Sequence, residues 1–390
     1  MEYILGGPTL PRDPELLRQI NLAAGRLDEK LRKLDLGRLG ISEYNQGYLG
    51  RKLAGLKNVL RRYAYLLALA LADNRQPLAE FTFVDYGGGS GVLSLLAKEL
   101  GIGRVIYDDI YDVSCKDAAI IAGATGIGVD DHVCGDMDAL IRYLEERSLS
   151  INAISSHDVI EHIYDMEGYL RSLRLLPSDS LRVVFGCGSN IKHPLIRRKL
   201  MKNHLECEYR NRDRQWGHKE RDSLRSYLDM RKEIIRAYAP ALSEDTVERI
   251  ARLTRGLMKR GIEKSVDEYR ARGEISYKPD HPTNTCDPYT GNWAEHLIRP
   301  EWFEDILKDE GFKAQVLSGY YPSPVAPYKR VITTLLNVGI KYLGKWSLYL
   351  APYYIVYADY RGKSASRGGS ASRESAQSSG LPPTSTGSPR

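Results

Sequence analysis

Hydrophobic and polar positions along the chain predict a β-strand, a glycine turn and an α-helix in direct succession. Residues 81–86 are mostly aromatic or β-branched and follow the period-two pattern of a strand. Residues 92–100 keep an apolar face at helical spacing until Gly101 ends the run. The turn between them, 87–91, is almost entirely glycine, so no side chain blocks close approach of a ligand.

Six further apolar runs predict the other strands of one sheet. The first four alternate with helical patterns, which is typical of an α/β fold built on parallel strands. The last two follow a long interruption and are expected to pair as a closing hairpin. These runs are 104–110, 132–137, 151–157, 181–186, 312–318 and 353–359.

The remaining segments divide the chain into five parts. A helical segment precedes the sheet, and its apolar spacing over 49–72 places Arg61 and Arg62 on the outer side of a helix. Tyr44 and Tyr48, just before it, are either packing residues or the edge of a pocket. The expected parts are a helical preface (1–80), a core (81–190), a basic helical insertion (191–290), the end of the sheet with an amphipathic helix (291–360) and a disordered tail (361–390).

Composition narrows the class of protein. The chain of 390 residues is 42% hydrophobic, enough for one substantial core with an accessory layer, and its net charge of only +6 does not indicate a general nucleic-acid binder. The five cysteines are far apart, which predicts buried thiols in a reducing compartment, with neither a disulfide framework nor a metal site. The first residues lack the pattern of a signal peptide, so we expect a cytoplasmic protein.

The spacing of the glycines indicates which class of ligand the turn binds. A dinucleotide fingerprint needs a small residue where the chain has Val92, and a P-loop needs a lysine at the helix entry, yet none occurs before Lys98. The chain instead follows Asp-x-Gly-x-Gly-x-Gly, with the residues Asp85, Gly87, Gly88, Gly89 and Gly91. This pattern resembles the first motif of the class I S-adenosylmethionine-dependent methyltransferases. A tight turn in some other α/β domain is the alternative.

The resemblance implies a binding site for S-adenosylmethionine along the following strand ends. Asp109 lies about twenty residues past the glycines, where a carboxylate can accept both hydroxyls of a ribose. Ala118 follows Asp109 at the family's second-motif spacing, which favours Asp109 over Asp108. Ile110, the next residue, belongs to the same expected cofactor site. Either aspartate could instead cap the following helix.

The end of the third strand is where the family holds the adenine. Asp136 would accept a hydrogen bond from the exocyclic amine, and Met137 would lie against the face of the ring. The resemblance implies a Rossmann-like seven-stranded methyltransferase sheet, with an N-terminal helical segment and a large helical insertion added to it.

The exit of the fourth strand carries the most family-specific residues. It resembles the small-molecule branch, which includes the ubiquinone-biosynthesis type of O-methyltransferase, through Ile160-Glu161-His162. Ligands lie at the carboxyl ends of strands in such sheets, so His157 is expected beside the cofactor and the transferable methyl. His157 is the first candidate for a general base, and His162 and His296 follow it, because imidazole titrates near neutrality.

The sequence leaves the acceptor open. The motifs of DNA-base methyltransferases are absent after the fourth strand, so the resemblance implies methyl transfer to oxygen of a small or carrier-linked, in some cases anionic, molecule. The alternatives are methylation of RNA or another macromolecule, and a non-catalytic binding protein on the same fold. The oligomeric state is not predicted.

Two segments have several candidate partners. Arginines at three-residue intervals, Arg249, Arg252 and Arg255, indicate a helix face that is either solvated or meets an anion, and we expect the insertion to form a substrate lid. The apolar segment 331–346 is too short to span a membrane. It could instead lie peripherally in a membrane interface, contact a partner subunit or cover the core.

Overall fold

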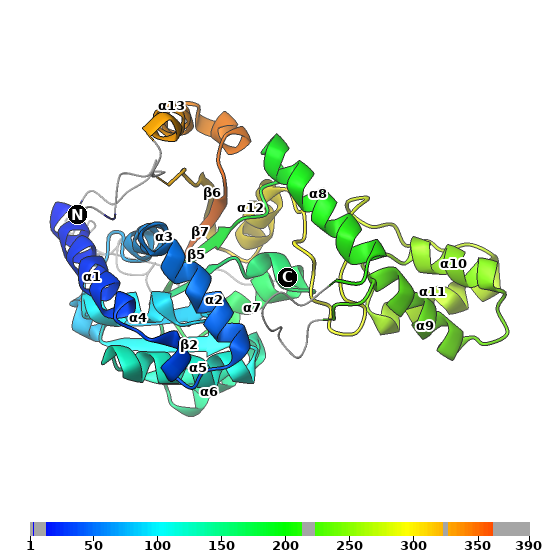
Figure 1. Ribbon diagram of the computed structural model, residues 1–390, viewed down its shortest axis with the longest axis horizontal. Helices are drawn as coiled ribbons and strands as arrows, with labels where there is room; N and C mark the ends of the chain where they lie inside the picture. The colour runs from blue at the N-terminus through cyan, green and yellow to red at the C-terminus, as the bar shows by residue number, and fades with distance from the viewer. Residues whose placement is uncertain (1–2, 4–12, 213–222, 323–326, 362–390) are drawn as a thin grey trace, which may run out of the picture.

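A seven-stranded sheet forms the centre of the computed structural model, which describes residues 3, 13–212, 223–322 and 327–361 (Figure 1). The strand order is β3-β2-β1-β4-β5-β7-β6, and β7 runs antiparallel to both of its neighbours. The predicted α/β, Rossmann-like, seven-stranded fold is therefore confirmed. The strands are β1 Thr82–Tyr86, β2 Arg104–Asp109, β3 Asp131–Cys134, β4 Ala153–His157, β5 Ser180–Cys187, β6 Lys313–Ser318 and β7 Tyr354–Arg361.

Strand β1 is the point at which the order of the sheet reverses. It pairs in parallel with β2 on one side and with β4 on the other, so the carboxyl ends of all three meet at one edge. Ligands bind at this edge in open parallel sheets. Because β6 runs in the same direction as β5, the end of β6 and the start of β7 also lie at this edge.

Helices cover both faces of the sheet because successive side chains of a buried strand point to opposite sides. Phe83 and Val84 are both fully buried, and each belongs to a different hydrophobic cluster. The first cluster draws on α1 Pro14–Arg32, α3 Leu56–Ala70, α4 Val92–Leu100 and α5 Asp112–Thr125. The second draws on α6 Met137–Glu146, α7 Met166–Ser172 and α12 Pro300–Asp309.

The N-terminal helical segment differs from its prediction in two ways. The expected helix over 49–72 is two helices, α2 Glu43–Ala54 and α3, which meet at Gly55. Arg61 is buried rather than on an outer side, because α1 packs against α3 on one side while β4 and β5 pack against it on the other. Short 3-10 turns complete this part of the chain: η1 Leu36–Arg38 and η2 Leu78–Glu80.

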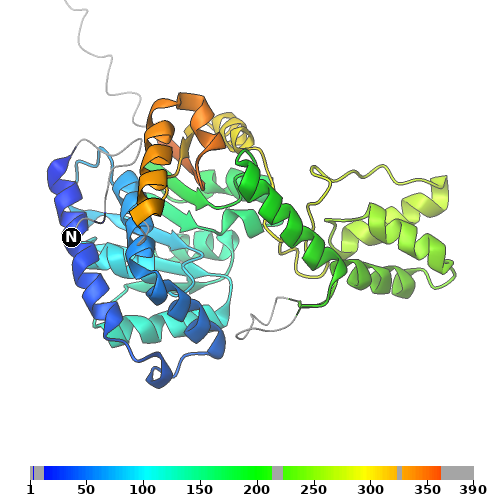
Figure 2. The same ribbon diagram turned by 45° about the horizontal axis from the view of Figure 1, so that its top comes forward.

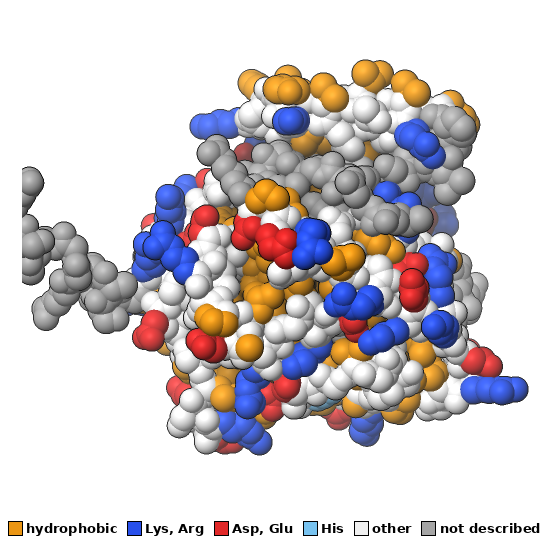
Figure 3. Space-filling model, turned by 90° about the vertical axis from the view of Figure 1, so that its left-hand side faces the viewer, with side chains coloured by type: hydrophobic (Ala, Val, Ile, Leu, Met, Phe, Trp, Pro, Cys, Tyr) orange, Lys and Arg blue, Asp and Glu red, His pale blue; other side chains and the backbone are white. Residues whose placement is uncertain are grey.

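The connection between β6 and β7 consists of α13 Pro327–Tyr342 and η5 Gly344–Tyr349. Figure 3 shows a row of hydrophobic side chains along the top of the molecule, where Figure 1 places α13. Within the described ranges, no helix combines the length and apolar character needed to cross a bilayer. The expected disordered tail beyond Arg361 falls on residues outside those ranges.

The insertion after β5 has a hydrophobic cluster of its own. It contains α8 Pro194–Tyr209, α9 Tyr227–Tyr238, α10 Glu244–Leu253 and α11 Lys259–Arg272. The last three helices pack around one apolar cluster and project away from the sheet (Figures 1 and 2). The expected arginine face is wrong in one respect, because α10 ends before Arg255 and this residue lies off the helix.

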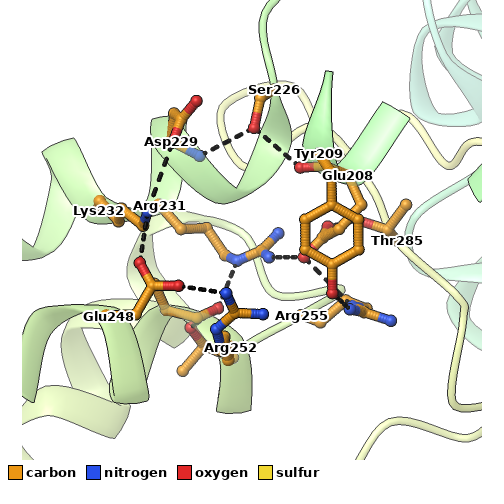
Figure 4. Close-up of polar contacts among 12 residues, drawn as sticks. Glu208, Tyr209, Ser226, Asp229, Arg231, Lys232, Glu248, Arg252, Arg255 and Thr285 are labelled. Atoms are coloured by element: carbon orange, nitrogen blue, oxygen red, sulfur yellow. Dashed lines mark hydrogen bonds and ion pairs between the residues drawn. The ribbon is translucent and has the colours of Figure 1, made fainter. Parts of the chain in front are cut away.

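A buried ion network ties the insertion to the rest of the chain (Figure 4). Glu208, at the end of α8, accepts hydrogen bonds from Arg231 and Arg255 and from Oγ1 of Thr285, the last at 2.7 Å. Buried charges are tolerated when they are paired and hydrogen-bonded in this way. Part of the basic character of the insertion is therefore structural, since these arginines fix α8, α9 and the returning chain together.

One pair of cysteines differs from the expectation that all five are free thiols. Cys115 on α5 and Cys134 at the end of β3 form a disulfide, while Cys187, Cys207 and Cys286 are free and buried. The two partners are 19 residues apart in sequence, but the crossover from β2 through α5 to β3 brings their Cα atoms within 6.1 Å. Spacing alone could not reveal this contact.

Candidate functional site

The glycine turn between β1 and α4 has a backbone that only glycine adopts easily. Gly87, Gly89 and Gly91 have φ values of +66°, +57° and +71°, in the left-handed region. A Cβ on Gly87 would lie 2.6 Å from Cγ2 of Val159, and one on Gly88 would lie 2.7 Å from the ring of Tyr107. The turn is therefore fixed tightly against its surroundings.

Asp85, the first residue of the motif, holds this turn to the following helix. Its Oδ2 accepts hydrogen bonds from the backbone N–H (2.9 Å) and the hydroxyl (2.7 Å) of Ser94. The carboxyl is buried, and burial raises its pKa to about 6 even though the bonds from Ser94 act in the opposite direction. Asp85 therefore positions the turn and is itself shielded from solvent.

Asp85→Asn should remove a pH dependence of stability. The folded protein holds the Asp85 proton more tightly than the unfolded chain, so this stabilisation is present below the ordinary aspartate pKa of 3.8 and is lost as the pH rises through about 6. Urea unfolding across this range should show the slope in the wild type and not in the variant, a difference on the order of 3 kcal/mol. The exposed Asp112→Asn is the control. Equal slopes for wild type and Asp85→Asn would contradict the assignment.

Asp109 points its carboxylate at the glycine turn. Its Oδ2 accepts a hydrogen bond from the N–H of Gly89 at 2.9 Å, and its Oδ1 accepts one from the N–H of Tyr111 at the same distance. Tyr111, not Asp109, is the N-cap of α5. Asp108 is buried, and burial followed by the charges of Asp109 and Asp136 raises its pKa well above the usual range. Of the two aspartates, Asp109 is the one beside the turn.

The residues expected around an adenine lie beside this carboxylate but differ in exposure. Asp136 is exposed and caps α6 through a hydrogen bond from the N–H of Ala139 to its Oδ1 at 3.1 Å. Met137 is buried within the second hydrophobic cluster. Ile110, next to Asp109, is 44% exposed. The apolar surface that faces solvent here therefore belongs to Ile110 rather than to Met137.

Helix α2 places an aromatic ring over the turn. A Cβ on Gly89 would lie 3.0 Å from the ring of Tyr48, which stacks on Tyr44 at a centroid distance of 5.9 Å. Lys52 lies over the ring of Tyr48 and donates a 2.8 Å hydrogen bond to the hydroxyl of Tyr63. Sequence reasoning missed Lys52 and Tyr63. The spacing of Tyr44, Tyr48 and Lys52, each four residues after the last, is the signal that could have placed them on one helix face.

His157 ends β4 at the same edge of the sheet. Its Nδ1 lies 3.0 Å from Oδ2 of Asp158, while its Nε2 is buried without a hydrogen-bond partner among the described residues. The rings of Tyr63 and Tyr353 flank the imidazole, at centroid distances of 5.7 and 6.2 Å. Burial alone would raise the pKa of the Asp158 carboxyl, but the neighbouring imidazole of His157 lowers this pKa, and the net shift is downward. One imidazole nitrogen is thus oriented by a carboxylate, and the other is buried between aromatic rings.

The short turn after β4, η3 Ile160–His162, carries a buried carboxyl. Oε1 of Glu161 accepts a hydrogen bond from the N–H of Gly188 at 3.1 Å, and its Oε2 has no partner in the part of the chain that the structure describes. Burial, and then the charges of Asp158 and Glu295, raise the pKa of Glu161 well above its usual range. Sequence reasoning missed Glu295, which comes from far along the chain.

The chain that returns from the insertion docks along η3. The N–H of His296 donates to the carbonyl of Glu161 at 2.8 Å, and Nδ1 of His162 lies 2.8 Å from the carbonyl of Trp293. The ring of His296 stacks on Trp293 at 4.0 Å, and burial, followed by the nearby His204, lowers its pKa to about 4. The structure therefore brings His162 and His296 to the exit of β4, where His157 lies.

Comparisons with known proteins add similarities of fold. No family model matches the sequence, and no curated protein matches it. Many solved structures resemble the chain in fold, and three of them illustrate the degree of similarity. An S-adenosylmethionine-dependent methyltransferase from Clostridium acetobutylicum is 9% identical with a TM-score of 0.38, and the match covers 80% of this chain and 99% of that protein. One from Mesorhizobium loti is 14% identical with a TM-score of 0.34, and the match covers 76% of this chain and 95% of that protein. Phosphoethanolamine N-methyltransferase 2 of Haemonchus contortus is 13% identical with a TM-score of 0.35, and the match covers 76% of this chain and 52% of that protein. Similarities this low do not decide function, which has to follow from the site.

Proposed function

We propose that this chain is a class I S-adenosylmethionine-dependent methyltransferase. The observation that carries the proposal is the carboxylate of Asp109 directed at the N–H of Gly89, in a turn that is free of side chains at the carboxyl edge of the sheet. A ribose with two hydroxyls fits such a carboxylate, and the exposed Ile110 beside it fits the flat face of an adenine. The residues present therefore suit this cofactor.

Each part of the turn has a distinct role in binding. Asp109 would accept hydrogen bonds from the ribose hydroxyls, and Gly87 and Gly89 would let the backbone approach the ligand. Asp136 has one carboxylate oxygen outside its capping bond, and this oxygen would accept a hydrogen bond from the adenine amine. Met137 supports this surface from within the core.

Methyl transfer needs alignment more than it needs a protein nucleophile. When bound, S-adenosylmethionine supplies a methyl group that its sulfonium charge already activates. Holding an acceptor in line at about 3 Å can contribute several kcal/mol. We propose oxygen of a small or carrier-linked molecule as the acceptor, with Nε2 of His157 taking the hydroxyl proton while Asp158 holds the imidazole through Nδ1.

The geometry favours His157 over the other two histidines for this role. His296 has a pKa of about 4, so its imidazole is a weak base at neutral pH. His162 uses Nδ1 in the contact with the carbonyl of Trp293, which fixes its ring to the returning chain. His157 combines a carboxylate partner with a buried nitrogen that is not otherwise bonded among the described residues.

A second candidate is methyl transfer to an amine nitrogen. Asp158, Glu161 and Glu295 place three carboxyl groups near one another at the exit of β4. Such a cluster favours a cationic acceptor over an anionic one. The two candidates differ in when a proton is lost, because an ammonium group can release its proton before transfer and then attack through the nitrogen lone pair, whereas a weakly acidic hydroxyl must lose its proton during transfer.

Titration calorimetry with S-adenosylmethionine and S-adenosylhomocysteine tests the assignment directly. Both ligands should bind to the wild-type chain, and ATP and NAD serve as controls that share only the adenosine part. A tritiated-methyl screen of hydroxyl, amine and RNA acceptors then distinguishes the two candidates from a macromolecular substrate. The absence of binding heat with both S-adenosylmethionine and S-adenosylhomocysteine would remove the proposal.

Replacing residues 191–290 with a short linker should abolish turnover and leave cofactor binding nearly intact. The chain returning from the insertion touches Glu161 and His162 through backbone contacts, whereas the residues proposed for the cofactor lie on β1 and β2 and in the turns after β1, β2 and β3. Calorimetry and the methyl-transfer assay on the same preparation measure the two properties. Loss of both together, in a variant that still unfolds cooperatively, would show that the segment is part of the core.

A further inference from the structure

The connection between β6 and β7 presents apolar side chains to solvent instead of burying them. Leu335, Tyr342 and Trp346 are 67%, 74% and 68% exposed. With about 100° of rotation per residue, the outward residues of α13 lie within roughly 120° of arc, which is one face of the helix. We call these residues the α13 face: Tyr328, Val331, Ile332, Leu335, Val338 and Tyr342, continued by Leu343, Trp346 and Tyr349.

The opposite side of the same helix is fixed to the body of the protein. Ile340 is buried, and the side chain of Asn337 forms two hydrogen bonds with the backbone of Tyr321, at 2.8 and 3.0 Å. Asn190 donates to the carbonyls of Leu348 and Ala351, both at 2.8 Å. The α13 face is therefore held outward by an anchored inner side.

The charged residues within the segment that carries the α13 face have a single sign. Residues 311–358 contain no aspartate or glutamate, while Lys329, Arg330, Lys341 and Lys345 lie beside the apolar residues and are exposed. Figure 3 shows basic side chains beneath the hydrophobic row. A helix with an apolar face and basic flanks is attracted to anionic lipid and buries its apolar residues between the headgroups.

Two further features suit a bilayer surface. Tyrosine and tryptophan, which favour the boundary between lipid and water, are present at the end of the α13 face as Tyr342, Trp346 and Tyr349. The segment just before α8 adjoins the same region, because Lys192, which is ion-paired with Glu301, lies over the ring of Tyr349 at 5.8 Å. Leu195, in the first turn of α8, is also exposed.

We propose that the α13 face binds the surface of an anionic lipid bilayer, with α13 lying in the interface and its basic flanks against the headgroups. β6 ends and β7 begins at the carboxyl edge of the sheet, so binding would turn the edge that carries Asp109 and His157 toward the lipid. The proposal goes beyond methyl transfer and does not rest on it, because lipid binding is measured without cofactor or acceptor.

Cosedimentation of the full chain with extruded vesicles tests the proposal. The protein should bind vesicles of phosphatidylcholine with one-third phosphatidylglycerol at low salt, bind them less well as salt rises, and bind pure phosphatidylcholine weakly. Leu335→Glu should reduce partitioning about tenfold or more, because it places a charge where an apolar side chain enters the lipid. Lys341→Ala with Lys345→Ala should also reduce it about tenfold.

Matched controls show whether a loss of vesicle binding is specific to the α13 face. Leu175 is 64% exposed at a distance in the sequence from α13, so Leu175→Glu should bind vesicles like the wild type. Absence of binding at low salt, or unchanged binding by Leu335→Glu, would overturn the proposal. A wild-type dimer that Leu335→Glu converts to a monomer, without vesicle binding, would also overturn it and identify the face as a contact between two copies. Thermal unfolding verifies that each variant is folded.

Discussion

Gly89→Val is expected to abolish binding of S-adenosylmethionine. Gly89 has a φ of +57°, where a β-branched residue is strained, and a Cβ there would lie 3.0 Å from the ring of Tyr48. Valine adds two methyl groups beyond this Cβ, at a residue whose N–H donates to the carboxylate of Asp109. The variant should therefore show no binding heat where the wild type shows a full isotherm.

A second glycine provides a control for backbone strain. Gly126 has a similar φ of +68° at the end of α5, but a Cβ there would meet no atom within 4 Å. Gly126→Val should lower stability and keep the affinity for S-adenosylmethionine. If the two valine variants lose affinity equally, the loss reflects strain in the fold and not the site.

Asp109→Ala tests the same assignment without altering the backbone. It removes a charged acceptor, so binding of both S-adenosylmethionine and S-adenosylhomocysteine should weaken by about 1.5 to 3 kcal/mol. The exposed Asp112→Ala should bind like the wild type. Unchanged affinity in Asp109→Ala would contradict the place given to the ribose, even if Gly89→Val is inactive.

The parts of the fold that sequence predicted well are those that local pattern determines. Phe83 and Val84 alternate between two faces because neighbouring strand residues always do, and the turn after Tyr86 needs glycine wherever it occurs. Asp85 and Asp109 follow from their positions at the motif and at the next strand end. The seven-stranded sheet and its closing hairpin are confirmed because the chain keeps the number and spacing of strands that the resemblance implied.

The errors arise where distant segments meet. Arg61 was expected outside, but whether a helix has an outer side depends on α1, which packs over it from another part of the chain. Glu295 reaches Glu161 only because the chain returns from a long insertion and pairs with η3. The pairing of Cys115 with Cys134 depends on the same kind of crossover contact. The spacing of apolar residues along the chain carries no information about contacts between segments that are far apart in the sequence.

The outward face of α13 is an intermediate case. The sequence identified 331–346 as an apolar helix and left three partners open. The structure excludes one of them, because the α13 face is exposed and therefore does not cover the core. A membrane interface and a second copy of the chain differ in the sign of charge that they favour, and the charged residues of the connection between β6 and β7 are all basic.

His157→Ala is expected to lower the rate of methyl transfer by about a hundredfold or more at unchanged affinity for the cofactor, which is the usual contribution of a general base. The variant leaves Asp109 and the glycine turn intact, so calorimetry should give the wild-type result. Turnover is measured with the acceptor that the tritiated-methyl screen identifies. His281→Ala, a histidine in the insertion, is the matched control.

The pH dependence of the rate distinguishes a base from a residue that only fills space. In the wild type, the pH–rate profile should have an acid limb, and this limb should flatten in His157→Ala. Asp158→Asn should retain part of the rate, because Nδ1 keeps an oxygen partner but loses the charge that supports a protonated ring. If His157→Ala keeps near-normal turnover while His296→Ala or Glu161→Ala is inactive, the base has been misassigned. If all three variants retain activity, transfer proceeds by alignment alone, which is the result expected for the amine acceptor.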